Sequence, residues 1–124
     1  MDSLGKILVV DDEEIFCTVL ASSLQHRGYT VRSAVSGREA IEALNREYFD
    51  AVITDLQMEE INGYGVAAHV KTCSAQTTVI LITGGDCSKI EDEALEQGVD
   101  VLFQKPFAVE ELLPYLPPSN TKGR

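Results

Sequence analysis

Short apolar runs alternate with amphipathic segments along this chain, and that alternation constrains the fold more than any other feature. The runs Ile7–Val10 and Val79–Ile82 are continuously apolar, as strands covered on both faces of a parallel sheet are. Phe49–Thr54 and Val101–Phe103 have the character of two further strands, and the shorter, more polar Thr30–Ala34 suits a sheet edge. Five strands separated by helices predict an α/β fold with a doubly wound parallel sheet.

The segments between these strands carry apolar residues at spacings of three to four, which is the periodicity of an amphipathic helix. Glycines close the first and fourth of these segments, as C-terminal caps often do. The residues Ser36 to Glu39 resemble a capping box that opens the second. Proline in the last segment predicts a short or kinked helix. The expected helices are a first one with the apolar stripe Ile15, Phe16, Val19, Leu20 and Leu24 before Gly28, then about 36–46, 63–72, 88–97 before Gly98, and 109–113 before Pro114.

The length of 124 residues fits one domain, with 44% hydrophobic residues to form a core. We expect residues 1–116 to form this domain and residues 117–124 to be a flexible tail or the start of a linker. No long apolar run indicates a membrane span, and the N-terminus lacks the features of a signal peptide, so a cytoplasmic protein is expected.

Charge and composition exclude several classes of function. Ten basic against 20 acidic residues give a net charge of -10, which disfavours nucleic-acid binding through this domain. Three widely spaced cysteines without a C-x-x-C pair predict reduced, structural thiols. Two histidines are too few for an ordinary zinc site.

Polar residues cluster where the predicted strands end. Asp11 and Asp12 follow the first strand, Asp55 the third and Thr83 the fourth, and Lys105 follows the fifth. Ligands of open parallel sheets bind outside the carboxyl ends of the strands. In the common strand order 2-1-3-4-5, strands one, three, four and five are neighbours, so all these side chains would converge on one cleft.

Three carboxylates in one cleft favour a bound cation, because like charges raise one another's free energy. Mg²⁺ suits hard oxygen ligands and retains waters that a phosphate can displace. A lysine and a hydroxyl opposite the metal could bind the other oxygens of a phosphoryl group. Asp55, alone at its strand end, is placed to be the nucleophile that forms an acyl phosphate.

Four segments in order resemble one family. ILVVDDEE resembles the acidic-pair motif of response-regulator receiver domains, which act in bacterial two-component (phosphorelay) signalling, and AVITDLQM, continuing through Gly63, resembles their phosphoacceptor segment. VILITGGD resembles the strand with their switch Thr or Ser, and FQKPF their lysine-proline motif. The resemblance covers about Lys6 to Leu116 and implies a flavodoxin-like (βα)5 fold.

The resemblance implies a Mg²⁺-dependent role for the acidic residues. Asp55 would accept a phosphoryl group from a histidine kinase or histidine phosphotransfer protein. Asp12 would bind Mg²⁺ directly, Asp11 through a metal-bound water, and Gln57 through its backbone carbonyl, with Asp55 as a further ligand. Glu13 and Glu14 have a simpler interpretation, since acids favour the N-terminus of a helix.

The same resemblance assigns the remaining site residues. Thr83 would bond a phosphoryl oxygen and move with the following loop, and Lys105 would pair with Asp55 or its phosphate. Lys105–Pro106 is expected to be a cis peptide. Such a domain catalyses only its own phosphorylation and dephosphorylation. It signals to a downstream effector protein or domain, without membrane contact, as a monomer or weak dimer.

Two departures from the family pattern leave alternatives open. Leu102 stands where the family usually has an aromatic switch residue, with Phe103 on the other face of the strand, and Glu59 replaces a common proline. These favour a second hypothesis, a pseudo-receiver that binds proteins without phosphorylation. A haloacid-dehalogenase-type phosphatase is disfavoured, because Gln57 stands where that family needs a second aspartate.

Overall fold

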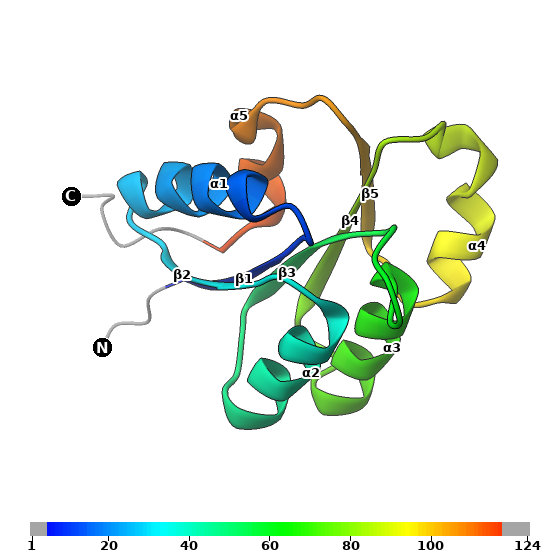
Figure 1. Ribbon diagram of the computed structural model, residues 1–124, viewed down its shortest axis with the longest axis horizontal. Coiled ribbons are helices and arrows are strands. Elements are labelled where there is room, and N and C mark those ends of the chain that lie inside the picture. The colour runs from blue at the N-terminus through cyan, green and yellow to red at the C-terminus, as the bar shows by residue number, and fades with distance from the viewer. Residues whose placement is uncertain (1–4, 118–124) are drawn as a thin grey trace.

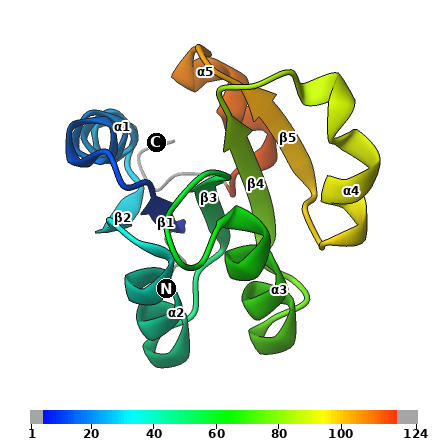
Figure 2. The same ribbon diagram turned by 45° about the vertical axis from the view of Figure 1, so that its right-hand side comes forward.

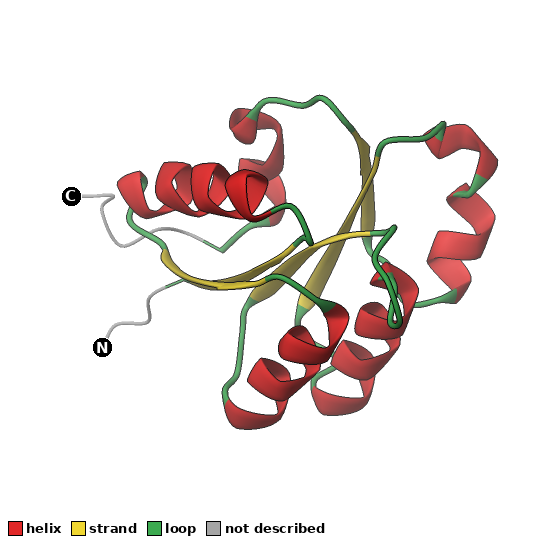
Figure 3. Ribbon diagram, in the orientation of Figure 1, coloured by secondary structure: helices red, strands yellow, loops and turns green. Residues whose placement is uncertain are grey.

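The computed structural model describes residues 5–117, which form alternating strands and helices (Figures 1 and 3). The expected tail therefore lies, from residue 118 on, outside the described residues. Within 5–117, no helix combines the length and the apolar character that a membrane crossing needs. The elements are β1 (Lys6–Val10), α1 (Glu14–His26), β2 (Thr30–Ala34), α2 (Gly37–Arg46), β3 (Ala51–Asp55), α3 (Gly63–Cys73), β4 (Thr78–Thr83), a 3₁₀ turn η1 (Cys87–Lys89), α4 (Glu91–Glu96), β5 (Val101–Gln104), α5 (Val109–Leu112) and a 3₁₀ turn η2 (Leu113–Tyr115).

The strands form one parallel sheet of order β2-β1-β3-β4-β5, as predicted for a flavodoxin-like fold. β2 lies at one edge, in agreement with its polar sequence. Because every strand runs the same way, the carboxyl ends of β1, β3, β4 and β5 meet along one rim. The predicted convergence of the site residues follows from this order.

Two apolar clusters occupy the two faces of the sheet, since alternate strand residues point to opposite sides. One cluster joins Leu8, Val52 and Leu81 to α2, α3 and α4. The other joins Ile7 and Ile53 to α1, α5 and η2. Figures 1 and 2 show α1 and α5 on one side of the sheet and α2, α3 and α4 on the other.

The first helix is rotated relative to the predicted apolar stripe. Ile15 and Val19 are 80% and 63% exposed, so their expected place on the buried stripe was wrong. Leu20 and Leu24 are buried as predicted, and Cys17 and Ala21 complete the inner face. Ile15 and Val19 stand two positions before Cys17 and Ala21, and their side chains therefore point away from the sheet.

The predicted fourth helix, residues 88–97, is divided in two. The 3₁₀ turn ends at Lys89, and Ile90 has a φ of −120° that is outside the helical range before α4 begins. Asp86 caps the 3₁₀ turn by accepting from the Ser88 amide at 3.0 Å. The last helix is short, as Pro114 predicted: α5 has four residues and continues as a 3₁₀ turn.

Candidate functional site

The two central carboxylates are held by adjacent strands. Val10 of β1 pairs in register with Thr54 of β3, so Asp11 and Asp55 occupy neighbouring positions at the rim. Asp11 is 1% exposed and Asp55 8%. Their backbones are fixed independently of the side chains: the Asp11 amide donates to the Ala34 carbonyl, and the following Leu56 amide to that of Ile82. The site is therefore built on the rigid part of the fold.

Asp11, Asp12 and Asp55 form the predicted acidic cluster. One oxygen from each carboxylate lies within 4.8 Å of the other two. Asp12 is exposed, while the other two are buried, so a cation would be bound at the boundary between solvent and protein. The arrangement suits a hard divalent cation that keeps part of its water shell, as Mg²⁺ does. Gln57, whose backbone carbonyl was expected as a further ligand, lines a hollow together with Asp12.

Lys105 supplies the opposing charge. Its Nζ lies 3.2 Å from Asp11 Oδ2, 3.6 Å from Asp55 Oδ1 and 3.7 Å from Glu13 Oε1. The backbone places it there, because the Lys105 amide donates to the Thr83 carbonyl at 2.8 Å. The Lys105–Pro106 peptide is cis, as expected. The expected pairing with Asp55 is present, but the shorter contact is to Asp11.

Two residues near this lysine were not predicted as part of the site. Glu13, at the N-cap of α1, approaches Lys105 as well as opening the helix. The Phe16 ring lies beneath the ammonium, with Nζ 4.4 Å from the ring centroid, a cation–π contact. Helical spacing could not have found this contact, because Asp12 precedes α1, which begins at Glu14.

The local charges shift the pKa values of the site. Burial and the neighbouring Asp11 carboxylate raise the pKa of Asp55 from 3.8 to about 6, although Lys105 opposes this. Burial lowers the pKa of Lys105, but Asp11, Asp55 and Glu13 more than offset it and raise the pKa above its ordinary value. Lys105 therefore keeps its positive charge, whereas ionisation of Asp55 costs free energy. A metal ion bound beside Asp55 would lower that free-energy cost.

Thr83 ends β4 and is 2% exposed. Its Oγ1 accepts from the Gly85 amide at 3.0 Å, and Gly84 has no heavy atom within 4 Å of where a Cβ would stand. There is thus open space at Gly84, and a Cβ on Gly85 would stand 3.6 Å from the Thr83 hydroxyl oxygen. On β5, Leu102 packs in the cluster with α3 and α4, whereas Phe103 packs in the opposite cluster with α1 and α5. The prediction that Phe103 faces away from Leu102 is confirmed.

The loop after Asp55 is tightly folded. A Cβ on Gly63 would stand 2.6 Å from the Asp55 carbonyl oxygen and 2.9 Å from Leu56 Cα, so only glycine allows this close approach. Asn62 caps α3 by accepting from the Gly65 amide at 3.1 Å. Within the loop, Glu60 has a φ of 68°, a left-handed conformation, and its carboxylate pairs with Arg38 at 2.7 Å. These contacts fix the loop that carries Gln57.

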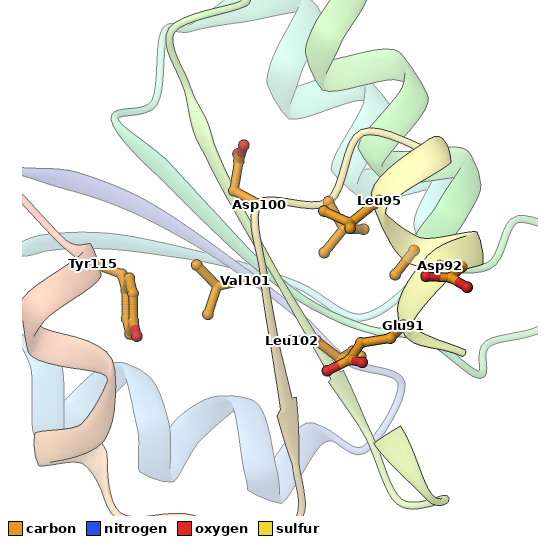
Figure 4. Close-up of a pocket in the computed structure, with 9 residues that line it drawn as sticks. Glu91, Asp92, Leu95, Asp100, Val101, Leu102 and Tyr115 are labelled. Carbon is orange, nitrogen blue, oxygen red and sulfur yellow. The ribbon is translucent and has the colours of Figure 1, made fainter. Parts of the chain in front are cut away.

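A second hollow, which none of the three aspartates of the acidic cluster lines, lies between α4, β5 and η2 (Figure 4). Figure 4 shows Tyr115 on one side of β5 and Leu95 of α4 on the other. Leu95 is 66% and Tyr115 45% exposed. Glu91 and Asp92 add carboxylates to its rim. We call this hollow the β5 groove.

Comparison with known proteins identifies the family of this chain. Residues 7–116 match the model of the response regulator receiver domain. The response regulator MprA of Mycolicibacterium vanbaalenii is 34% identical over 108 residues, which cover 87% of this chain and 47% of the relative. The transcriptional regulatory protein TcrA of Mycobacterium tuberculosis is 31% identical over 118 residues, covering 95% and 47%. The chain therefore spans about half the length of the curated relatives it matches.

Solved structures show the same fold. The chemotaxis protein CheY4 of Vibrio cholerae superposes with a TM-score of 0.84 at 28% identity, covering 91% of this chain and 96% of its own. A response regulator of Burkholderia pseudomallei, solved with a phosphorylated aspartic acid, a calcium ion and citrate, gives a TM-score of 0.85 at 30% identity, covering 91% and 66%. The fold, the ordered motifs and these matches lead to one assignment: the chain belongs to the response regulator receiver domain family of two-component systems.

Proposed function

We propose that this chain is a phosphorylatable receiver in which Asp55 accepts a phosphoryl group in a Mg²⁺-dependent reaction. One observation carries the proposal: a buried carboxylate at the end of the central strand lies 3.6 Å from a lysine ammonium and within an acidic cluster. The phosphorylated aspartic acid in the Burkholderia pseudomallei relative supports the same chemistry.

In the transfer step, an Asp55 carboxylate oxygen attacks the phosphorus of a phosphohistidine. The new O–P bond forms as the P–N bond breaks, and the imidazole nitrogen leaves with the electron pair. No proton needs to leave the carboxylate while it is ionised. Catalysis then consists of alignment and charge neutralisation, which are the main contributions of proteins to phosphoryl transfer.

Asp11, Asp12, Asp55 and the Gln57 carbonyl would hold the Mg²⁺, which supplies positive charge to the phosphoryl oxygens. Lys105 would bind another phosphoryl oxygen, since its Nζ already lies 3.6 Å from Asp55 Oδ1. The Thr83 hydroxyl, whose oxygen accepts from the Gly85 amide, would donate its own hydrogen to a third oxygen. The glycines at 84 and 85 leave room for the loop to follow.

The donor would be a histidine kinase or histidine phosphotransfer protein that docks on α1. Ile15 and Val19 expose their side chains there, and Phe16 and Val19 also line a hollow with Lys105 and Phe107. An exposed apolar surface beside a reactive carboxylate suits a protein donor, which must bury it to bring phosphohistidine into line.

We also propose the remaining assignments as expectations of this function. Residues 1–116 would be the receiver and 117–124 a linker or tail, in a cytoplasmic protein that is a monomer or weak dimer. The domain would catalyse only its own phosphorylation and dephosphorylation and would switch an effector protein or domain, without binding nucleic acid itself. The net charge of -10 supports the last point.

Mass spectrometry of the intact protein tests the proposal. The protein is incubated with Mg²⁺ and acetyl phosphate or phosphoramidate, and one added phosphoryl group is expected within minutes. Asp55→Asn should abolish the addition, while Asp92→Asn, an exposed aspartate of α4, should leave it unchanged. No addition to the wild type, where a known receiver is modified, would contradict the proposal and favour the pseudo-receiver.

A further inference from the structure

A string of aromatic rings runs from the phosphoryl site to the β5 groove. It begins with Phe16, whose ring centroid lies 4.4 Å from Lys105 Nζ. The Phe16 and Phe107 centroids are 6.3 Å apart, edge to face at 76°, and those of Phe107 and Phe103 are 5.9 Å apart. Phe103 contacts Tyr115 at 5.8 Å, again edge to face. Each spacing falls within the contact range of packed aromatic pairs.

The two ends of this string have different surroundings. At one end, Lys105 faces the carboxylates of Asp11, Asp55 and Glu13. At the other end, Tyr115 is 45% exposed and forms one wall of the β5 groove (Figure 4). The string therefore connects the charged site to an accessible surface through side chains alone.

The sequence of β5 makes this route distinctive. Leu102, which also lines the groove, is aliphatic and packs on the face shared with α3 and α4. The strand's aromatic residue, Phe103, packs instead with α1 and α5, where Phe16 and Phe107 also lie. All ring contacts of the string thus lie on the α1–α5 face of the sheet.

We propose that Phe16 is a positioning residue for Lys105, and that the ring string transmits a displacement of Lys105 to Tyr115 at the β5 groove. The inference rests on the proposed function, since a phosphoryl group on Asp55 is what would draw the ammonium away from Asp11. Phe16 follows the ammonium because their contact is electrostatic. Phe107 and Phe103 then shift because packed side chains transmit displacements.

Fluorine NMR of protein labelled with 3-fluorotyrosine tests this route. The chain has four tyrosines, and Tyr→Phe substitutions assign their signals. The probe is Mg²⁺ with beryllofluoride, which mimics an acyl phosphate and whose own bound fluorine signal reports occupancy. On binding, the Tyr115 signal should move, whereas Tyr48, exposed near the opposite rim, should not.

Three leucine variants separate transmission from binding. Phe103→Leu breaks the string without touching Lys105, so beryllofluoride should still bind while the Tyr115 shift falls at least threefold. Phe16→Leu should lose the shift and also weaken beryllofluoride binding by roughly threefold or more. Phe49→Leu, the matched control outside the string, should keep both the Tyr115 shift and beryllofluoride binding. A full Tyr115 shift in Phe103→Leu would overturn the proposal.

A second arm needs no ligand and remains informative even if Asp55 is not a phosphoacceptor. Lys105→Met should by itself move the Tyr115 signal, because it removes the cation that Phe16 contacts. Lys6→Met is the control, since Lys6 Nζ lies 5.4 Å from the Phe49 ring centroid, outside the string. Absence of bound beryllofluoride in the wild type would count against the proposed function alone. An unmoved Tyr115 in Lys105→Met would overturn the string.

Discussion

Lys105 Nζ lies closer to Asp11 Oδ2, at 3.2 Å, than to Asp55 Oδ1, at 3.6 Å. The lysine therefore bonds one carboxylate of the pair and stays within reach of the other. Under the proposed function, a divalent ion between the aspartates would compete with the lysine for Asp11 and release the ammonium toward Asp55. Metal binding and the position of Lys105 would then be coupled through the Asp11 carboxylate.

Removal of Lys105 should weaken the fold of the metal-free protein. Lys105→Met leaves Asp11 and Asp55 buried without their cation, and we expect a loss of about 1–3 kcal/mol in the free energy of unfolding. Mg²⁺ should restore more stability to this variant than to the wild type. Urea unfolding with and without Mg²⁺ measures both effects. Lys89→Met, in the exposed 3₁₀ turn, is the control, and equal losses in the two variants would contradict the expectation.

The raised pKa of Asp55 predicts a pH dependence of stability. The folded state holds the Asp55 proton up to about pH 6, whereas the unfolded state releases it near pH 3.8. The folded state thus binds more protons between these values, so stability should fall as pH rises from about 4 to 6. The loss contributed by this group should be on the order of 1–2 kcal/mol.

Asp55→Asn removes this titration, and its effect is measurable by thermal unfolding from pH 4 to 8 without Mg²⁺. The variant should lose less stability over this interval than the wild type and should be the more stable protein at pH 7. Saturating Mg²⁺ should narrow that difference by favouring the ionised carboxylate. Parallel pH profiles for the two proteins would refute the assignment of the shift to Asp55.

The close approach at Gly63 predicts a large effect from one methyl group. Gly63→Ala places a Cβ 2.6 Å from the Asp55 carbonyl oxygen, which forces β3 and α3 apart. We expect a loss of about 1–3 kcal/mol in the free energy of unfolding and slower phosphorylation. Gly84→Ala, where the new methyl group has open space, should stay within about 0.5 kcal/mol of the wild type.

The exposed residues of α1 should affect one class of phosphodonor only. Ile15→Ser with Val19→Ser should slow transfer from a phosphorylated histidine protein about tenfold, because the apolar docking surface is lost. Phosphorylation by acetyl phosphate and the unfolding temperature should stay nearly unchanged, since both side chains are largely exposed. Leu95→Ser, on α4, is the matched control. Equal slowing with both donors would exclude a docking role.

The sequence predicted the strand order and the meeting of Asp11, Asp12, Asp55, Thr83 and Lys105, because continuous apolar runs end in polar residues and parallel strands share one rim. The sequence could not predict which side chains of α1 are buried, because this depends on tertiary packing. Periodicity alone placed Ile15 and Val19 on the buried stripe of α1, whereas the small residues Cys17 and Ala21 take those places. The ring contacts of Phe16 depend on side-chain directions in three elements and had no single local signal.

The order of the strands in the sequence also determines the order in which the site residues are synthesised on the ribosome. Asp11, Asp55 and Lys105 belong to β1, β3 and the segment after β5, and β4 lies between the last two in the sheet. A nascent chain therefore lacks the lysine of the site until β1 to β5 have all been synthesised. Asp11 and Asp55 are synthesised first, and Lys105, which neutralises their charge, is synthesised last. Under the proposed function, Asp55 would therefore gain its lysine partner only when the receiver domain is almost complete.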